Sequence, residues 1–353
     1  MTVGTTEAPD VLLCGYYGED NLGDDALLQV LLQELPPHVR PLITARDADA
    51  VRQLAPDALL VDRRSLRSVI ASIGRVRAVI FGGGSLLQDS TSMRSLVYYL
   101  VLILVARLRG RVVLLWGQGL GPLKRPISRW MVRVVLPLCS AASWRDQRSH
   151  DLAQRLAPAL SMQLAPDPVW QLPRQPWIGG GAIVVSWRPT PLLDNRGWSE
   201  ILQALTRLSD DLDVPVRWLA LHQHQDAALL SELNQRGLVP SSLYRRSTTV
   251  VPNRVEAVVS SVEDARLVLP MRLHALILAR LVCCPMAALS YDPKVEAAAA
   301  MAGVPCSSLH DQPDANALLI QWRRALDRPA DPGQIDDIRW RASAHADLLR
   351  RML

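Results

Sequence analysis

The sequence lacks any apolar run long enough to cross a membrane. The longest run, Leu96–Ala106, is stopped by Arg107 and Arg109. A transmembrane helix needs about 20 apolar residues, so we expect a buried helix at this position instead. Met1–Asp10 contains no basic segment followed by an apolar one. We therefore expect no secretion signal.

Cysteine and aromatic residues are also scarce. The five cysteines are odd in number and lack CxxC spacing, which favours free thiols in a reducing cytoplasm over disulfides. Aromatic residues make up 5% of the chain, and no basic run is interleaved with them, so nucleic-acid binding is not expected. His222 and His224 lie two residues apart without a clear third ligand, so we predict no metal site.

The length and the charge of the chain limit the remaining possibilities. A chain of 353 residues is too long for one ordinary core, so two domains are expected. Its composition, 49% hydrophobic and 21% charged, is typical of globular proteins. The net charge of +5 fits a small anionic substrate or a loose association with an anionic membrane surface.

Short apolar runs alternate with helical patterns along the whole chain. This alternation predicts an α/β fold with parallel sheets covered on both faces. The predicted strands are Val11–Cys14, Pro41–Thr44, Ala58–Val61, Ala78–Phe81, Val112–Trp116, Ala141–Trp144, Ala182–Trp187, Val214–Leu221, Leu267–Leu269 and Met286–Ser290. The predicted helices include Ala26–Leu35, Trp198–Asp211, Asp226–Gln235, Arg272–Leu281, Lys294–Ala302 and Ile335–Met352.

Two prolines and three glycines interrupt this alternation between Pro173 and Gly181. Such a segment is a credible hinge or linker. We therefore predict an N-terminal Rossmann-like domain over residues 1–172, a linker over 173–181, a second Rossmann-like domain over 182–330 and a C-terminal helical segment over 331–353. Two such domains would leave a cleft between them, which is a common place for a binding site.

Three glycine-rich loops follow predicted strands of the first half. The first, Gly15–Asp25, contains Asn21 and Asp24, and its glycines allow close approach of the backbone to an anion or a sugar. The second loop is Gly82–Asp89. Its residues Gly83 and Gly84 leave the backbone exposed, and the side chains of Gln88 and Asp89 offer hydrogen-bonding groups to sugar hydroxyls. In the third, Trp116–Pro122, the candidate is Gln118. An ordinary tight turn is the alternative for each loop.

Basic side chains and one histidine follow other predicted strands. Arg145 comes directly after Ala141–Trp144, and an arginine there can grip a carboxylate or phosphate with two hydrogen bonds. Arg272 and His274 follow the strand at Leu267–Leu269, and Lys294 follows the next one. Ligands of open α/β sheets bind beyond the carboxyl ends of the strands. Cations beside an imidazole at this edge suit an anionic substrate that exchanges a proton.

Taken in order, these motifs resemble the polysaccharide pyruvyl transferases, and most closely the bacterial type called CsaB. The resemblance extends from about Val11 to about Val304. One departure is Trp144, where a smaller aliphatic residue is expected. The motifs that carry the resemblance are Gly15–Gly18, Asn21–Asp24, Gly82–Ser92, Trp116–Gly119, Arg145-Asp146, Arg272–Ala275 and Tyr291–Val295.

The resemblance implies a glycosyltransferase-B-like fold of two Rossmann-like domains, and a specific reaction. A pyruvyl group would pass from phosphoenolpyruvate to a sugar of a cell-surface (cell-wall) polysaccharide precursor as a cyclic ketal, with release of phosphate and without a cofactor. In this family the catalytic residue falls on His274, and the residues that bind phosphoenolpyruvate fall on Arg145, Arg272, Leu273 and Lys294. The acceptor sugar is assigned to the glycine loops, at Gly15, Asn21, Asp24, Gly83, Gly84, Gln88, Asp89 and Gln118.

Two other functions are compatible with the same residues. One is a B-type glycosyltransferase that uses a nucleotide sugar, and the other is a carbohydrate-binding protein without catalytic activity. The resemblance further implies a cytoplasmic protein. A lipid-linked acceptor would bring it to the inner face of the cytoplasmic membrane as a peripheral protein.

Overall fold

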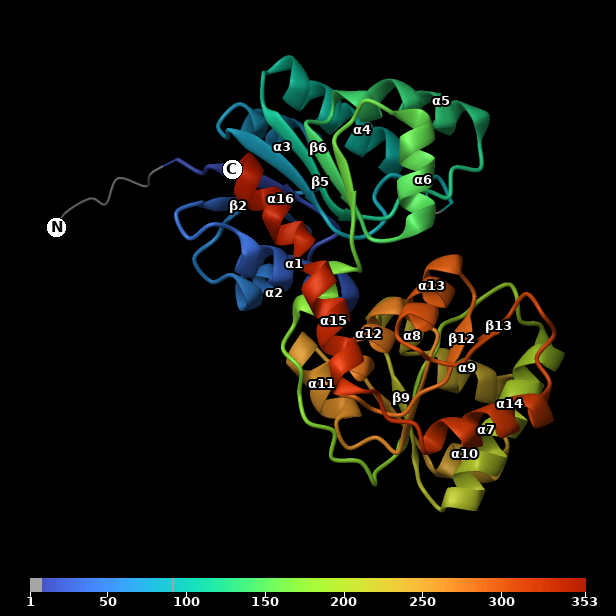
Figure 1. The fold of residues 1–353 in the computed structure, drawn as a ribbon. Helices are drawn as coiled ribbons and strands as arrows, with labels where there is room; N and C mark the ends of the chain where they lie inside the picture. The colour runs from blue at the N-terminus through green and yellow to red at the C-terminus, as the bar shows by residue number, and fades with distance from the viewer. Residues whose placement is uncertain (1–7, 91) are drawn as a thin grey trace. The chain divides into compact units, whose positions relative to one another are not determined.

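The structure is a computed structural model that describes residues 8–90 and 92–353, and the chain divides into two compact units (Figure 1). Unit 1 comprises the described residues up to Glu19, then Asp24–Gln171 and Trp340–Leu353. Unit 2 comprises Asp20–Gly23 and Leu172–Arg339. The expectation of no secretion signal rests partly on residues 1–7, which lie outside the described residues.

Unit 1 contains a seven-stranded parallel sheet in the order β3-β2-β1-β4-β5-β6-β7. Its strands are β1 (Val11–Cys14), β2 (Pro41–Ala45), β3 (Leu59–Asp62), β4 (Ala78–Gly82), β5 (Val112–Gln118), β6 (Ala141–Trp144) and β7 (Met162–Leu164). The chain adds strands first on one side of β1 and then on the other, so the order reverses between β1 and β4. In doubly wound sheets, ligands bind in the crevice at this reversal.

Helices cover the sheet of unit 1. They are α1 (Leu22–Glu34), α2 (Ala48–Leu54), α3 (Leu66–Ile73), α4 (Met93–Leu108), α5 (Pro126–Val135), the 3-10 helix η1 (Leu136–Leu138), α6 (Gln147–Leu156), the 3-10 helix η2 (Pro168–Gln171) and α16 (Ala344–Met352). Alternate strand residues, such as Leu12, Val79 and Val113, join one core cluster with α3, α4, α5 and α6. Trp116 of β5 instead donates a hydrogen bond from its indole to the carbonyl of His345 in α16.

Unit 2 repeats the same strand order. Its parallel sheet has the order β10-β9-β8-β11, and a parallel bridge from Val268 to Met286 leads on to the pair β12-β13. The strands are β8 (Ile183–Ser186), β9 (Val216–Leu219), β10 (Ser247–Val250), β11 (Leu267–Pro270), β12 (Ala288–Ser290) and β13 (Cys306–Ser308). The order therefore reverses between β8 and β11, as it does between β1 and β4 of unit 1.

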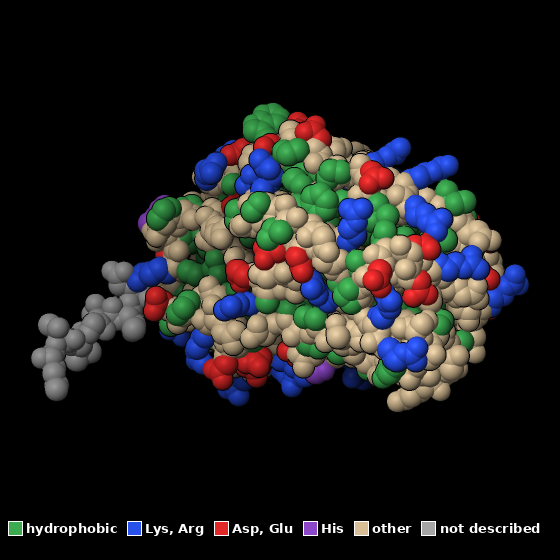
Figure 2. All heavy atoms as spheres, turned by 90° about the horizontal axis from the view of Figure 1, so that it is seen from below, with side chains coloured by type: hydrophobic (Ala, Val, Ile, Leu, Met, Phe, Trp, Pro, Cys, Tyr) green, Lys and Arg blue, Asp and Glu red, His purple; other side chains and the backbone are tan. Residues whose placement is uncertain are grey.

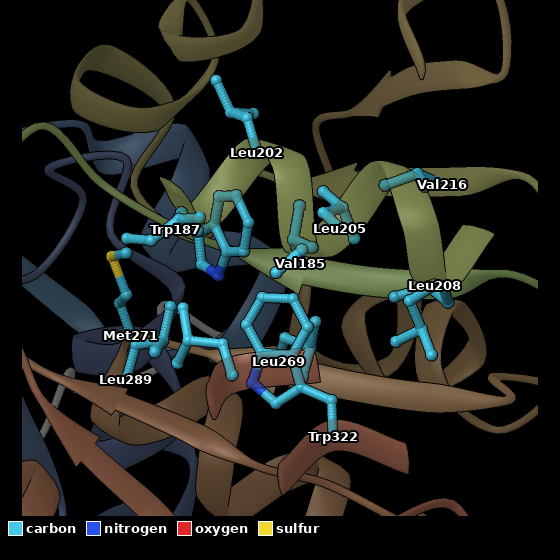
Figure 3. Close-up of a cluster of buried hydrophobic side chains, with 14 of the residues drawn as sticks. Val185, Trp187, Leu202, Leu205, Leu208, Val216, Leu269, Met271, Leu289 and Trp322 are labelled. Carbon is cyan, nitrogen blue, oxygen red and sulfur yellow. The ribbon is translucent and has the colours of Figure 1, made fainter. Parts of the chain in front are cut away.

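Nine helices of unit 2 are described. They are α7 (Asn195–Leu212), α8 (Gln223–Asp226), α9 (Leu229–Gln235), α10 (Ser241–Arg245), α11 (Val255–Val262), α12 (Leu273–Leu281), α13 (Pro293–Met301), α14 (Ala315–Leu326) and α15 (Pro332–Ala342). Helices α7, α9, α10 and α14 contribute to a cluster of buried side chains that Figure 3 shows in part. Trp187 and Met271, which directly follow the ends of β8 and β11, are 2% and 0% exposed in this cluster. Their burial fixes where the loops that follow these strands begin.

The α/β class with parallel sheets is confirmed, but two predicted helices are wrong. Asp226–Gln235 is not one helix, because Asp226 ends the short helix α8 and its buried carboxylate accepts the backbone N–H of His222. Ile335–Met352 is divided into α15 and α16 at Ser343, whose hydroxyl donates to the carbonyl of Trp340. At Ser343 a polar side chain bonds to local backbone at the break, whereas the Asp226 bond lies at the start of α8, on its N-cap residue His222.

The expectation of a buried helix at Leu96–Ala106 is half right. A helix forms, and Leu96, Leu102 and Ile103 are fully buried, but Val97 and Leu104 are 40% and 41% exposed. Three short strands, β7, β10 and β13, were not predicted from the sequence. Over the residues described, none of the helices combines the length and the apolar character that crossing a membrane requires.

Candidate functional site

The carboxyl ends of four neighbouring strands in unit 2 carry basic, histidine and tyrosine side chains. Arg188 follows β8, and His222 follows β9. Arg272 and His274 follow β11, while Tyr291 and Lys294 follow β12. Because parallel strands all point the same way, these residues lie along one edge of the sheet, at the reversal between β8 and β11. We call these six residues the basic edge of unit 2.

Arg272 is held in a fixed orientation by Asp226. Its Nε lies 3.1 Å from Oδ2 of Asp226, and its second guanidinium nitrogen bonds to Oδ1 of the same carboxylate. A further bond of 3.1 Å reaches the amide oxygen of Gln225. Asp226 is almost fully buried. This two-pronged pairing orients the guanidinium plane at the start of α12.

His274 lies in the first turn of α12, against the backbone of Gly23. A Cβ atom placed on Gly23 would come within 2.0 Å of Nδ1 of His274, which is far closer than atoms can approach. The φ angle of Gly23 is not in the left-handed region. Gly23 is therefore required by the space that the His274 ring occupies, and not by backbone conformation.

The segment Asp20–Gly23 is attached to unit 2 by several bonds. Asn21 forms an antiparallel bridge with His222, and the N–H of Leu22 donates to the carbonyl of Leu221 over 3.0 Å. Asp20 also pairs with His224, with 2.8 Å between Oδ2 and Nε2. These contacts hold Gly23 against His274. The Asn21–Asp24 motif, predicted for the acceptor side, thus begins beside the predicted catalytic histidine.

Arg188, Tyr291 and Lys294 form the other part of the basic edge. The guanidinium of Arg188 lies over the Tyr291 ring, 4.9 Å from its centre, and bonds to the Tyr291 hydroxyl over 3.3 Å. Lys294 lies 3.6 Å from Asp292, and about a third of its side chain is exposed. Burial raises the pKa of Tyr291, but the charges of Lys294, Arg188 and Arg272 outweigh it, so this pKa lies below its usual value.

The lowered pKa of Tyr291 indicates a positive electrostatic potential at this edge. Within residues 8–90 and 92–353, no carboxylate forms an ion pair with Arg188. Arg188 instead contacts neutral groups: its guanidinium stacks on the Tyr291 ring and donates to the Tyr291 hydroxyl and to a backbone carbonyl. The edge therefore has positive charge available for an anion.

His222 is a neutral, buried imidazole at the same edge. Burial and the adjacent Arg272 charge lower its pKa from the usual value. Its Nδ1 atom is buried and makes no hydrogen bond to the described part of the protein. Buried polar atoms without a partner are uncommon and call for an explanation.

In unit 1, Arg145 is placed differently from the cations of the basic edge. It is 7% exposed, and one guanidinium nitrogen lies 2.8 Å from Oδ2 of Asp167, which is also buried. A second nitrogen bonds to the hydroxyl of Ser85 over 3.1 Å. Its charge is thus already paired inside the unit. The predicted contact with phosphoenolpyruvate stays a prediction for Arg145, as does that of Leu273, which is 6% exposed.

The glycine loops of unit 1 occupy the reversal between β1 and β4. Gly83 and Gly84 have positive φ angles of 71° and 76°, a conformation that other residues rarely adopt. A Cβ on Gly84 would lie 3.1 Å from the Asp24 carboxylate, so these two predicted residues lie together. A Cβ on Gly15 would overlap the Tyr17 ring, and this glycine therefore makes room for a core tyrosine.

Three other predicted acceptor residues bond to the protein itself. Gln118 is fully buried, and its amide donates to the carbonyls of Phe81 and Gly83. Asp89 accepts the backbone N–H groups of Lys124 and Arg125, at 2.8 and 2.9 Å. The amide oxygen of Gln88 accepts from the backbone of Ser90 over 2.9 Å.

These bonds give Gln118 and Asp89 a clear structural role, which is to shape the loops after β4 and β5. Burial opposes ionisation of Asp89, but the two backbone hydrogen bonds prevail and keep its pKa below the usual value. A direct contact of either side chain with a sugar would require it to leave these partners. Binding of the acceptor by these residues stays a prediction.

Sequence reasoning missed Arg188, His222 and Tyr291 as members of the site. Arg188 directly follows the run Val184–Trp187, so the rule applied to Arg145 and Arg272 would have found it. Tyr291 lies in the motif Tyr291–Val295, and His222 lies two residues from His224, but neither pattern by itself indicates a place at the basic edge. Among the residues that the structure describes, no three His, Cys, Asp or Glu side chains come together as a metal-binding group.

Comparisons with known proteins agree with this architecture. The chain is similar to the UDP-N-acetylglucosamine 2-epimerase of Neisseria meningitidis bound to UDP-GlcNAc, with 12% identity over 97% of this chain and all of the other, and a TM-score of 0.62. It is similar to the same enzyme of Rickettsia bellii, with 12% identity, coverage of 98% and 96%, and a TM-score of 0.62. Anabaena HepE in complex with UDP-glucose gives 12% identity, 98% and 97% coverage, and a TM-score of 0.58.

At such low identity these structures show the fold alone, and the predicted glycosyltransferase-B-like fold of two Rossmann-like domains is confirmed. Comparison with curated proteins finds no relative. The family model for polysaccharide pyruvyl transferases matches residues 21–293, which include every residue of the basic edge except Lys294. Membership of the CsaB type stays a prediction. Because this match covers most of the sequence, the chain belongs to the polysaccharide pyruvyl transferase family.

Proposed function

We propose that this protein transfers a pyruvyl group from phosphoenolpyruvate to a sugar of a polysaccharide precursor, and that the donor binds at the basic edge of unit 2. The observation that carries the proposal is the grouping of Arg188, Arg272 and Lys294 around Tyr291, at the ends of adjacent strands and on the edge that also carries His274. The family match supports the reaction class. Donor and product are the parts that need a test.

The charge of the basic edge matches that of the proposed donor. Phosphoenolpyruvate has a carboxylate and a phosphate, and together these carry roughly three negative charges near neutral pH. Arg272, already oriented by Asp226, and Arg188, stacked on Tyr291, present planar guanidinium groups that suit carboxylate and phosphate oxygens. Lys294 adds a flexible point charge on the adjacent strand.

The proposed reaction consumes one phosphoenolpyruvate and two hydroxyls of one sugar. A proton adds to the methylene carbon, and C2 becomes electron-poor. One sugar hydroxyl attacks C2 and loses its proton. The second hydroxyl then displaces phosphate, which leaves with the remaining proton, and the cyclic ketal is closed. No electron is transferred to a cofactor, and the number of protons balances.

His274 is the proposed general acid/base of this sequence. It would either give the proton to the methylene carbon or take the proton from the attacking hydroxyl. Its ring is held in place by Gly23 on the segment bonded to Leu221 and His222. A fixed ring is useful because proton transfer requires hydrogen-bond distance to the reacting group.

The remaining parts of the proposal rest on the family resemblance. We propose that the acceptor binds to the glycine loops of unit 1, and the resemblance also assigns a contact with phosphoenolpyruvate to Arg145. A lipid-linked, cell-wall precursor as the acceptor and action in the cytoplasm are predictions of the same kind.

The test is an assay of phosphate release from phosphoenolpyruvate with a panel of sugar acceptors, together with mass spectrometry of the product. We expect phosphate release that depends on both substrates and a product heavier than the acceptor by one pyruvyl ketal. Lys294→Ala should raise the KM for phosphoenolpyruvate about tenfold or more, which corresponds to one lost charge-assisted hydrogen bond.

Two results would contradict the proposal. Transfer of a sugar from a UDP-sugar, the ligand type named for the similar Neisseria and Anabaena structures, without phosphate release would support the glycosyltransferase alternative. Saccharide binding without any reaction would support the carbohydrate-binding alternative.

A further inference from the structure

One part of the sequence is almost free of acidic residues. Between Arg63 and Arg145 there are fourteen Lys and Arg residues and a single acidic one, Asp89. The whole chain has 39 basic and 34 acidic residues, so the remainder holds 25 basic and 33 acidic. The chain is therefore divided between one strongly basic segment and a net acidic remainder.

The only acidic residue of this segment does not contribute to its surface. Asp89 is 6% exposed, and its carboxylate accepts the backbone N–H groups of Lys124 and Arg125. The basic segment consequently presents no carboxylate to the solvent. By contrast, Figure 2 shows a face on which acidic and basic side chains are interspersed.

The segment forms three neighbouring helices on one face of the unit 1 sheet. Helix α4 packs against α3 on one side and α5 on the other, and all three contribute to the same core cluster (Figure 1). Their outward sides form what we call the α3–α5 face. Its exposed basic residues are Arg67, Arg75, Arg94, Arg107, Arg109, Lys124, Arg125, Arg129 and Arg133.

These cations form no ion pair with a carboxylate of the described residues, although the charge of Arg125 acts on the buried Asp89 carboxylate. Across the described ranges, 8–90 and 92–353, no ion pair involves Arg107, Lys124, Arg125 or Arg133. The guanidinium of Arg109 donates to the backbone carbonyl of Ile70. The positive charge of the α3–α5 face is thus available to an external anionic partner.

Large apolar side chains are exposed on two of these helices, α4 and α5. On α4, Leu104 and Leu108 are 41% and 78% exposed, and Val97 lies about two and three turns before them on the same side. On α5, Ile127, Trp130 and Val134 follow the helical spacing i, i+3, i+7 and are 52–61% exposed. The opposite sides of both helices are buried in the core, so these six residues face outward.

We propose that the α3–α5 face binds the surface of an anionic phospholipid bilayer. A helix surface with exposed Trp, Leu, Ile and Val beside arginines is the pattern of helices that lie in a membrane interface. Tryptophan prefers the headgroup level of a bilayer, and unpaired arginines attract anionic lipids. A second copy of the chain is a poor occupant, because it would bring two uniformly basic surfaces together.

This inference does not depend on the pyruvyl transfer proposed above. Membrane binding would be measured without any substrate, and the reaction can be assayed with soluble acceptors. Each proposal can therefore fail alone. If both hold, binding at a membrane would bring the protein to an acceptor carried on a lipid.

The experiment is flotation of the full chain with vesicles of phosphatidylcholine alone or of phosphatidylcholine mixed with phosphatidylglycerol. We expect binding to the anionic vesicles, weak binding to the neutral ones, and loss of binding as salt is raised from 50 to about 500 mM, because salt screens exposed charges. Reversing two charges, with Arg107→Glu and Arg133→Glu, should weaken binding to the anionic vesicles at least about tenfold.

The apolar residues are tested separately with Leu108→Ser and Trp130→Ser, which should also weaken binding. Matched controls come from α14 of unit 2, where Ile320→Ser and Arg324→Glu change residues that are also exposed. These two should leave vesicle binding and stability unchanged. Since all altered side chains are exposed, folding should be retained, and this is checked by circular dichroism.

Three results would overturn the proposal. The first is a wild-type protein that does not float with the anionic vesicles at low salt. The second is binding to neutral vesicles as strong as binding to anionic ones, which would show that the arginines do not drive the association. The third is a dimer in sedimentation velocity that Leu108→Ser and Trp130→Ser dissociate without changing vesicle binding, since the face would then join two copies of the chain.

Discussion

The two units have the same strand order but use the edges of their sheets differently. In unit 1, the loops at the reversal between β1 and β4 are rich in glycine, and the one arginine predicted to bind donor is buried against Asp167. In unit 2, the corresponding reversal between β8 and β11 carries Arg188, Arg272 and His274. Arg188 there has no carboxylate partner among the described residues.

A shared fold therefore leaves the chemistry at the edge of the sheet open. The edge at the strand reversal can be lined by backbone and buried amides, as around Gly83 and Gln118. It can also be lined by charged side chains, as around Arg272. The first suits a neutral, hydroxyl-rich ligand. The second suits a small anion.

The largest effect is expected for His274→Ala in unit 2. Phosphate release from phosphoenolpyruvate should fall by about 10²- to 10⁴-fold, because general acid/base catalysis contributes that much. The control is His310→Ala, an exposed histidine of the same unit, which should retain full activity. Wild-type turnover in His274→Ala would remove this residue from the mechanism.

A contrast between the two units is expected for Arg145→Gln and Arg188→Gln. Arg145→Gln removes the guanidinium that pairs with the buried Asp167 carboxylate and should lower the free energy of unfolding by about 3–5 kcal/mol. Arg188→Gln, at a half-buried site without a carboxylate partner in the described structure, should change stability by less than about 1 kcal/mol. It should instead raise the KM for phosphoenolpyruvate about tenfold.

Urea denaturation and steady-state kinetics of both variants measure this contrast. Adding Asp167→Asn to Arg145→Gln should restore part of the lost stability, since the buried charge is then gone. The reverse pattern, with a stable Arg145→Gln and an unstable Arg188→Gln, would mean that the two arginines have been assigned the wrong roles.

A smaller effect is expected when Gly23 is enlarged. The methyl group of Gly23→Ala would lie 2.0 Å from Nδ1 of His274, so the ring must move. A displacement of this size should lower kcat by about 10- to 100-fold. Gly333→Ala, where a Cβ meets nothing closer than 3.5 Å, is the control. Equal kcat values in the two variants would show that the position of the His274 ring does not matter.

The smallest effect is expected for the pH dependence of stability that His345 of unit 1 causes. Burial lowers the pKa of His345 to about 4, against about 6.5 in an unfolded chain. Between these values the unfolded state binds more protons than the native state. The contribution of the buried, neutral His345 to the free energy of unfolding is therefore fully present above pH 6.5. It is lost as the pH falls toward 4, and the free energy of unfolding is lower by about 2–3 kcal/mol at pH 4.5.

Urea denaturation at pH 7 and at pH 4.5 measures this loss. His345→Gln keeps a hydrogen-bonding side chain next to Ser143 and Pro166 but cannot be protonated in this range. The variant should lose less stability on acidification than the wild type does. An equal loss in both proteins would assign the acid sensitivity to other groups.

Much of the fold could be predicted because strands and helices leave local patterns. The strands at Val11–Cys14 and Ala141–Trp144 were predicted with their observed bounds, and α12 begins one residue after the predicted start. Short strands such as β10, with the sequence Ser-Thr-Thr-Val, lack an apolar run and were missed. Their pairing with a neighbour, and not their own composition, makes them strands.

The candidate site was predictable only in part, because partners come from distant positions. The location of Arg272 and His274 after a strand follows from local sequence. The pairing of Arg272 with Asp226, 46 residues earlier, does not. Nor could the sequence show that Gly23 lies against His274, or that the side-chain amide of Gln118 donates a hydrogen bond to the carbonyl of Phe81.

A crystal structure with phosphoenolpyruvate bound would show whether the basic edge of unit 2 holds this compound. We expect the phosphate and carboxylate groups within hydrogen-bond distance of Arg188, Arg272 and Lys294, and His274 beside the methylene carbon. Phosphoenolpyruvate bound elsewhere, with these four side chains free of it, would contradict the account.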